Sequence, residues 1–155
     1  MSFRKNRSSS LVIMIATIVM IVLLGTAVGC SKTPATLEEY YDVHPDQLQK
    51  EVDDFKNSLS SDDFSDSSLT VSGNRIKMTG VMNFNLDEVD TDTKQLIIST
   101  LEDYLNDLGS ARQMAAAVKD TESITGIKGI TLTMIYADNR GRELASITYD
   151  ANGIA

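Results

Sequence analysis

The chain is poor in the residues that build most metal and redox sites. Its 155 residues include one cysteine, Cys30, one histidine, His44, and no tryptophan. A lone cysteine excludes an internal disulfide, so a folded domain must be stabilised by its own apolar core. A lone histidine excludes a multi-histidine metal site, and His44 directly precedes Pro45, a pattern that indicates the start of a helix.

Positive charge is scarce beyond the first few residues. Arg4, Lys5 and Arg7 are three of the 14 basic residues, and all 22 acidic residues lie at or after Glu38. A domain this acidic is repelled by the phosphates of nucleic acids, so we expect no nucleic acid partner. Such an excess usually forms a solvated surface, and an acidic face for a cationic partner is the alternative.

Motifs for catalysis and metal binding are also missing. The stretch from Asp90 resembles a calcium loop, but its sixth position is not glycine and its twelfth is Leu101 in place of glutamate. The sequence has no glycine-rich phosphate loop and no nucleophile elbow. We therefore expect no cofactor, no metal and no enzymatic activity. A small envelope-polymer hydrolase that uses a carboxylate pair is the alternative, although the sequence does not identify the pair.

The amino terminus has the three parts of a secretory signal. Basic residues precede an apolar run from Leu11 to Val28, and small residues lead from that run to Cys30. The run is also long enough for one membrane helix, so a cleaved signal and a retained anchor both stay open. Either way, the basic residues remain cytoplasmic and the rest of the chain lies outside.

The last four residues of this segment, Ala27-Val28-Gly29-Cys30, resemble a bacterial lipobox, although leucine is more usual where Ala27 stands. The resemblance implies a signal peptide over residues 1–29, a lipid on Cys30 and a short tether over residues 30–36. We expect one extracytoplasmic domain over residues 37–155, held at the cell membrane through the lipid on Cys30. Two acyl chains anchor a protein stably because each buried CH₂ contributes about 0.8 kcal/mol.

Helical patterns occupy two parts of this domain. Thr36 and Glu39 predict a capping box for a short helix, and apolar residues at helical spacing predict a second helix from Pro45, followed by a loop over residues 60–68. Further along, Asp92 is the expected cap of a long helix with Leu101 and Leu105 on its inner face. Gly109 and Ser110 are expected to break this helix from a shorter one.

Alternating patterns predict two β-hairpins. The first has its turn at Gly73-Asn74, and the second has its turn over residues 138–141. The order helix, β-hairpin, helices, β-hairpin predicts an α+β fold with a four-stranded antiparallel sheet and helices on one face. Leu101 and Leu105 are expected to pack against Leu132 and Met134 of that sheet.

Three stretches of the chain resemble an uncharacterised family of small lipoproteins from Gram-positive bacteria, grouped as a domain of unknown function. They are TLEEYYDVHPDQ, VSGNRIKMTGVMNF and ITLTMIYADNRGRELASITYD. In the last of these, Tyr136, Asp138 and Gly141 match the family's Y-x-D-x-x-G pattern. The resemblance implies membership but no catalytic residues.

These observations favour a binding or accessory module at the cell envelope. The first candidate surface is the solvent-facing side of the last hairpin, with Thr131, Thr133 and Ile135, and the second is the acidic segment Asp87 to Asp92. An envelope protein and a wall ligand are both partners that such a surface would suit. The sequence leaves the oligomeric state open.

Overall fold

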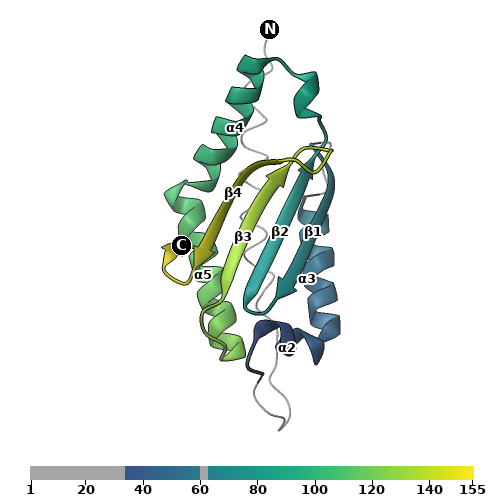
Figure 1. Cartoon of the computed structure of the whole chain (residues 1–155). Coiled ribbons are helices and arrows are strands. Elements are labelled where there is room, and N and C mark those ends of the chain that lie inside the picture. The colour runs from purple at the N-terminus through teal and green to yellow at the C-terminus, as the bar shows by residue number, and fades with distance from the viewer. Residues whose placement is uncertain (1–33, 60–62) are drawn as a thin grey trace.

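The computed structural model describes residues 34–59 and 63–155, so the expectations for the signal segment and for Cys30 lie outside the described residues. Within this part, no helix is both long and apolar enough to cross a membrane. The elements, shown in Figure 1, are α2 (Leu37–Asp42), α3 (Pro45–Ser58), β1 (Phe64–Ser72), β2 (Arg75–Met82), the 3₁₀ turn η1 (Leu86–Glu88), α4 (Thr91–Leu105), α5 (Leu108–Thr125), β3 (Thr131–Ala137), β4 (Glu143–Asp150) and β5 (Gly153–Ile154).

The first two helices begin where the sequence predicts. The Thr36 hydroxyl accepts a hydrogen bond from the Glu39 amide at 3.2 Å, and the Glu39 carboxylate accepts one from the Ala35 amide at 2.8 Å. His44 is the N-cap of α3, with Pro45 in the first turn. Because proline lacks an amide hydrogen, it sits at this position without losing a helical hydrogen bond.

The later helices differ from the prediction in their boundaries. Asp90, not Asp92, caps α4 by accepting a hydrogen bond from the Thr93 amide at 2.9 Å. Asp107 caps α5 through the amides of Gly109 and Ser110, so the break precedes Gly109. An aspartate carboxylate accepts hydrogen bonds from the free amides two or three residues ahead. Here the cap at Asp107, and not Gly109, therefore decides where α5 begins. As a result α5, with 18 residues, is longer than α4, with 15.

The sheet corrects the prediction of four antiparallel strands. It has five strands in the order β1-β2-β3-β4-β5, and its central pair, β2 and β3, is parallel. The reason is the crossover: α4 and α5 return the chain to the end of the sheet where β2 began, so β3 runs in the same direction as β2. The fifth strand is the short β5, which pairs with the end of β4.

The predicted loop over residues 60–68 is also wrong in part, because β1 begins at Phe64 and pairs with β2 from there. Its serines and aspartate lie mostly exposed on an edge strand, where polar residues are tolerated. The predicted turn is correct, and Gly73 has a φ of 58° at the bend. Gly80 on β2 is buried, and a Cβ there would lie 3.0 Å from the Phe64 ring and 3.3 Å from the Leu59 side chain.

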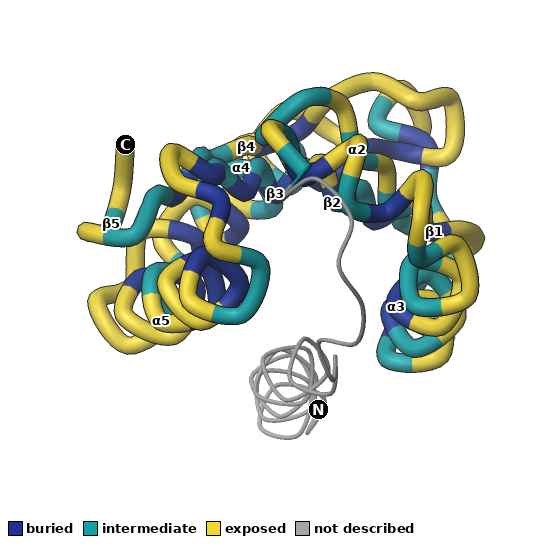
Figure 2. The backbone as a smooth tube through the Cα atoms, turned by 90° about the horizontal axis from the view of Figure 1, so that it is seen from below, coloured by how far each residue is buried: buried dark blue, intermediate teal, exposed yellow. Residues whose placement is uncertain are grey.

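The core lies between the sheet and its helices. Leu101, Leu105, Leu132 and Met134 all belong to one buried apolar cluster, as predicted. The Tyr149 hydroxyl donates a hydrogen bond to the Leu105 carbonyl at 2.7 Å, which ties β4 to the end of α4. Figure 2 shows α3 and α5 on the same side of the sheet, near its two edges. The prediction that the helices share one face is therefore confirmed.

The two ends of the sheet are tied to different segments. At one end, the Leu37 amide donates to the Asn74 side-chain oxygen at 3.0 Å, and the Gly73 amide donates to the Glu38 carboxylate at 2.6 Å. The start of α2 is thereby held against the β1–β2 turn. The β3–β4 turn lies at the opposite end, beside η1.

Candidate functional site

The face of the sheet turned away from the helices is the first candidate surface. Figure 1 views the sheet from this side, with α3 and α5 behind it, and no helix of residues 34–59 and 63–155 crosses it. Residues that stand opposite each other in neighbouring strands share a face. From the β1–β2 turn as far as Thr79 and Ile135, the strand registers place eleven side chains on what we call the open face: Ser68, Thr70, Ser72, Arg75, Lys77, Thr79, Thr131, Thr133, Ile135, Ser146 and Thr148. Beyond them the same face continues to Asp66 and Val81, which stand opposite each other.

The three residues predicted for partner binding lie on the central strand of this open face. Thr131, Thr133 and Ile135 are half-buried, while the alternate residues of β3 are buried in the core. The Thr133 and Thr148 hydroxyl oxygens are 2.9 Å apart across the β3–β4 pair. Eight of the eleven residues are serine or threonine, so the surface offers rows of hydroxyl groups that both donate and accept hydrogen bonds.

Two cations on the open face were missed by sequence reasoning. Arg75 stands opposite Thr131, and Lys77 stands opposite Thr133. Both are exposed, and in the described part of the chain neither side chain has a hydrogen-bond or ion-pair partner. The alternation of β2 carries the signal, since Ile76 and Met78 point to the core and Arg75 and Lys77 must point away.

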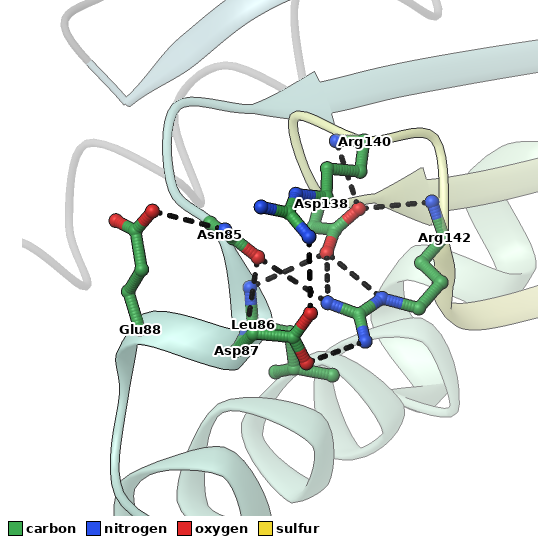
Figure 3. A network of polar contacts seen from close by, with 7 residues as sticks. All are labelled: Asn85, Leu86, Asp87, Glu88, Asp138, Arg140 and Arg142. Carbon is green, nitrogen blue, oxygen red and sulfur yellow. Dashed lines mark hydrogen bonds and ion pairs between the residues drawn. The ribbon is translucent and has the colours of Figure 1, made fainter.

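The second predicted surface, the segment Asp87 to Asp92, lies at the far end of the sheet and is not a free acidic patch. Figure 3 shows Asp87 facing two guanidinium groups of the β3–β4 turn. One Asp87 carboxylate oxygen is 2.8 Å from Arg142 and the other is 3.3 Å from Arg140. The pKa of Asp87 is lowered, chiefly by its hydrogen bond with Arg142. This part of the segment therefore serves to join η1 to the turn.

Asp138 is the centre of this polar cluster. It is fully buried, and its two carboxylate oxygens accept hydrogen bonds from the Leu86, Arg140 and Arg142 amides at 3.3, 3.0 and 2.9 Å. The Arg142 guanidinium adds bonds of 3.1 and 2.8 Å. Burial alone would raise the pKa of Asp138, but these hydrogen bonds outweigh it and hold the pKa at about 2. Every bond serves the local fold, so Asp138 shapes the turn.

A second buried carboxyl group, that of Glu51 on α3, faces α2. The Tyr41 hydroxyl donates to one oxygen of Glu51 at 2.6 Å, and the other oxygen is buried without a hydrogen-bond partner. Burial raises the pKa of both groups, and the Tyr41 hydrogen bond only partly offsets this for Glu51. Nearby, His44 stacks on Tyr40 with ring centroids 4.5 Å apart, which agrees with its predicted place at a helix start.

No cluster of three or more histidine, cysteine, aspartate or glutamate side chains in residues 34–59 and 63–155 has the arrangement to hold a metal ion. A family model described as "Domain of unknown function (DUF4854)" matches residues 37–149. The chain belongs to this family. The DUF4854 match covers α2 through most of β4, including both hairpins and the whole open face. The predicted membership of a domain-of-unknown-function family is therefore confirmed.

Two further comparisons found no relatives for this DUF4854 chain. No curated protein matches it, and no solved structure matches its fold. The Y-x-D-x-x-G residues of the family pattern, Tyr136, Asp138 and Gly141, lie in and beside the β3–β4 turn. Tyr136 is buried in the core and Gly141 has a φ of 77°. The pattern thus describes how this turn folds.

Proposed function

We propose that the chain is a lipid-anchored module on the extracytoplasmic side of the cell membrane, where its open face binds a polymer of the cell wall. The observation that carries this proposal is the open face itself. It combines rows of hydroxyl groups with two exposed cations that have no partner among the described side chains. A domain with this surface works by binding.

A wall polymer that carries hydroxyl and carboxylate groups suits this face better than a protein does. Protein interfaces concentrate their binding energy in large aromatic or arginine anchors set in pockets. The eleven residues of the open face include one large apolar side chain, Ile135, and no aromatic ring, and Val81 continues the same face beyond them. Hydroxyl rows spaced at the strand separation of about 4.8 Å suit a ligand with repeating polar groups. The nearby Arg75 and Lys77 complement carboxylates, and the acidic remainder of the domain is screened beyond about 10 Å.

The sequence of the amino terminus supports the anchor. Cys30 follows an apolar run and small residues that resemble a lipobox, and the first described helix, α2, begins seven residues later, at Leu37. The first helix is bonded to the β1–β2 turn, so a tether at Cys30 enters at one end of the strands. The strands then lead away from the point of attachment, which leaves the open face accessible along its length. A Gram-positive source fits this proposal, since its wall lies directly outside the membrane.

The anchor is tested by replacing Cys30 with alanine. We expect the variant to lose labelling by a fatty-acid probe and to keep the mass of the uncut precursor. A variant that is still labelled and still processed would contradict the lipid anchor and leave the binding role to be judged separately.

The binding role is tested by co-sedimentation of the full-length protein, in mild detergent, with purified insoluble peptidoglycan. Lys77→Glu on the open face is expected to reduce the bound fraction several-fold, whereas Lys56→Glu, an equal change of charge on exposed α3, is expected to leave it unchanged. Equal sedimentation of both variants, or none by the wild type, would refute the role of the open face. Release of soluble fragments from the polymer by the wild-type protein would refute a role limited to binding and would favour the carboxylate-pair hydrolase.

A further inference from the structure

A groove separates α5 from the short strand β5 on the side of the molecule remote from α3. Its volume is about 480 Å³, and it is lined by one stripe of α5 and by residues 151–154. The open face and the Asp138 cluster contribute no residue to it. Within residues 34–59 and 63–155, no other segment of the chain fills this groove.

The α5 side of the groove, which we call its floor, is made of small side chains, and the ends of the groove are apolar. The floor consists of Ala111, Ala115 and Ala116. Leu108 at one end is 70% exposed and Ile154 is 48% exposed, which makes them two of the four large apolar residues that stand out in the described part. Together with the alanines between them, these side chains form a continuous apolar patch rimmed by polar residues, which is typical of an interaction site.

The groove is positively charged, whereas the chain as a whole has a net negative charge. Arg112 and Lys119 line it, and no aspartate or glutamate does. Neither cation has a hydrogen-bond or ion-pair partner within residues 34–59 and 63–155. In a chain with a net charge of -8, two cations that line one groove without any acidic residue in its lining form a local positive site. A partner that complements the groove must therefore be apolar along its centre and acidic at its edge.

The spacing of the two cations favours a helix as that partner. Arg112 and Lys119 are seven residues apart on α5, which corresponds to about 10.5 Å along the helix axis. Two acidic residues seven apart on a second helix have the same separation. In an extended strand, residues on one face are separated by about 6.6 or 13 Å, and neither value matches. The alanines also allow a second helix to approach α5 closely.

We propose that the groove between α5 and β5 binds an acidic amphipathic helix of another envelope protein, with its apolar stripe over the alanines and its carboxylates on Arg112 and Lys119. This is helix-in-groove recognition, in which an apolar stripe gives affinity and flanking charges set orientation. It rests on the proposed function only for the envelope location of the partner, and it is independent of the wall-binding role because the two surfaces share no residue. The module would then hold a wall polymer on one surface and a protein on another.

A synthetic peptide tests the groove. The probe is a fluorescently labelled helix of about 15 residues made of alanine, leucine and glutamine, with two glutamates seven residues apart beside its leucine stripe. The control peptide has the same composition but carries its glutamates on the opposite side of the helix. Binding to the full-length protein in lipid nanodiscs is followed by fluorescence anisotropy. The probe is expected to bind at least several-fold more tightly than the control peptide.

Variants of the protein locate the binding. Arg112→Glu and Lys119→Glu are each expected to weaken binding about three- to tenfold and to reduce its dependence on salt, because each converts an attraction into a repulsion. Ala115→Leu fills the groove floor without a change of charge and is expected to abolish binding. Lys56→Glu on α3 is the matched control and is expected to change nothing.

Three results would overturn the proposal. Equal affinity for both peptides would show that general charge attraction, and not the groove, is responsible. Undiminished binding by the Ala115→Leu variant would place the site elsewhere. Concentration-dependent dimerisation that Arg112→Glu removes would show that the occupant is a second copy of this chain. A failure of wall binding would leave all three results unaffected, so the two proposals are judged separately.

Discussion

Replacing the buried Asp138 with asparagine is expected to weaken the fold and to change how its stability depends on pH. One oxygen of Asp138 serves the turn amides of Arg140 and Arg142, and the other serves the Leu86 amide and the Arg142 guanidinium. Asparagine has only one side-chain oxygen. In either orientation of its amide, the NH₂ group therefore points at hydrogen-bond donors from which it cannot accept. The loss of a hydrogen bond to a charged group costs about 1.5–3 kcal/mol at neutral pH.

The pH dependence follows from the depressed pKa of Asp138. An aspartate in the unfolded chain titrates near 3.9, and the folded value is about 2, a difference worth roughly 2–3 kcal/mol. The Arg142 side chain is 44% exposed, so screening by solvent reduces this to about 1–2 kcal/mol. Because the folded pKa is the lower one, the contribution is complete above about pH 4 and is lost as the pH falls toward 2.

The assay is thermal unfolding of the full-length protein in non-ionic detergent, followed by circular dichroism from about pH 7 to about pH 2.5. The stability difference between wild type and Asp138→Asn should be largest above pH 4 and should shrink by about 1 kcal/mol by the acid end, because a pH of about 2.5 is still above the folded pKa. Asp103→Asn is the control, because Asp103 is exposed on α4. A difference between wild type and Asp138→Asn that stays constant over this pH range would refute the reasoning.

Three further substitutions test the packing. Leu101→Ala should cost about 2–5 kcal/mol in chemical denaturation, because the side chain is 3% exposed in the core, and an unchanged midpoint would mean that α4 buries another face. Gly80→Ala should cost about 1–3 kcal/mol by the same assay, since its methyl group crowds Phe64, and no loss would show that the ring moves freely. Glu51→Gln should stabilise the protein at pH 7, since burial disfavours the charged carboxylate, and the gain should vanish below the pKa of an unfolded glutamate, near pH 4. Melting curves that are equal at pH 7 would contradict this.

The elements of the fold were predictable where a local pattern decides them. The capping box at Thr36, the helix start at Pro45 and the bend at Gly73 depend on residues within a turn of one another, and all three are correct. The buried positions Leu101 and Leu105 followed from helical spacing in the same way. In each case the residues that make the structure are neighbours in the sequence.

The errors concern choices between distant or competing partners. The parallel pairing of β2 with β3 depends on how α4 and α5 cross the sheet, and strand alternation is the same for both directions. The break after α4 was misplaced because Asp107 competes with Gly109 as a signal. The cations Arg112 and Lys119 carry no motif, and only the folded chain shows that they flank the same groove.

The parallel pair at the centre of the sheet has a consequence for how the chain folds as it emerges. Arg75 at the start of β2 pairs with Thr131 at the start of β3, so the central ladder joins segments 56 residues apart in sequence. The β1–β2 hairpin forms from local contacts, but one edge of β2 stays open until β3 has been synthesised. At a synthesis rate of about 5–20 residues per second, that edge is exposed for several seconds. During this interval Ile76 and Met78 are uncovered beside unpaired backbone groups, which are the conditions for edge-to-edge aggregation. We therefore expect the yield of folded protein to depend more on substitutions that slow the pairing of β3 than on equally destabilising changes in α3.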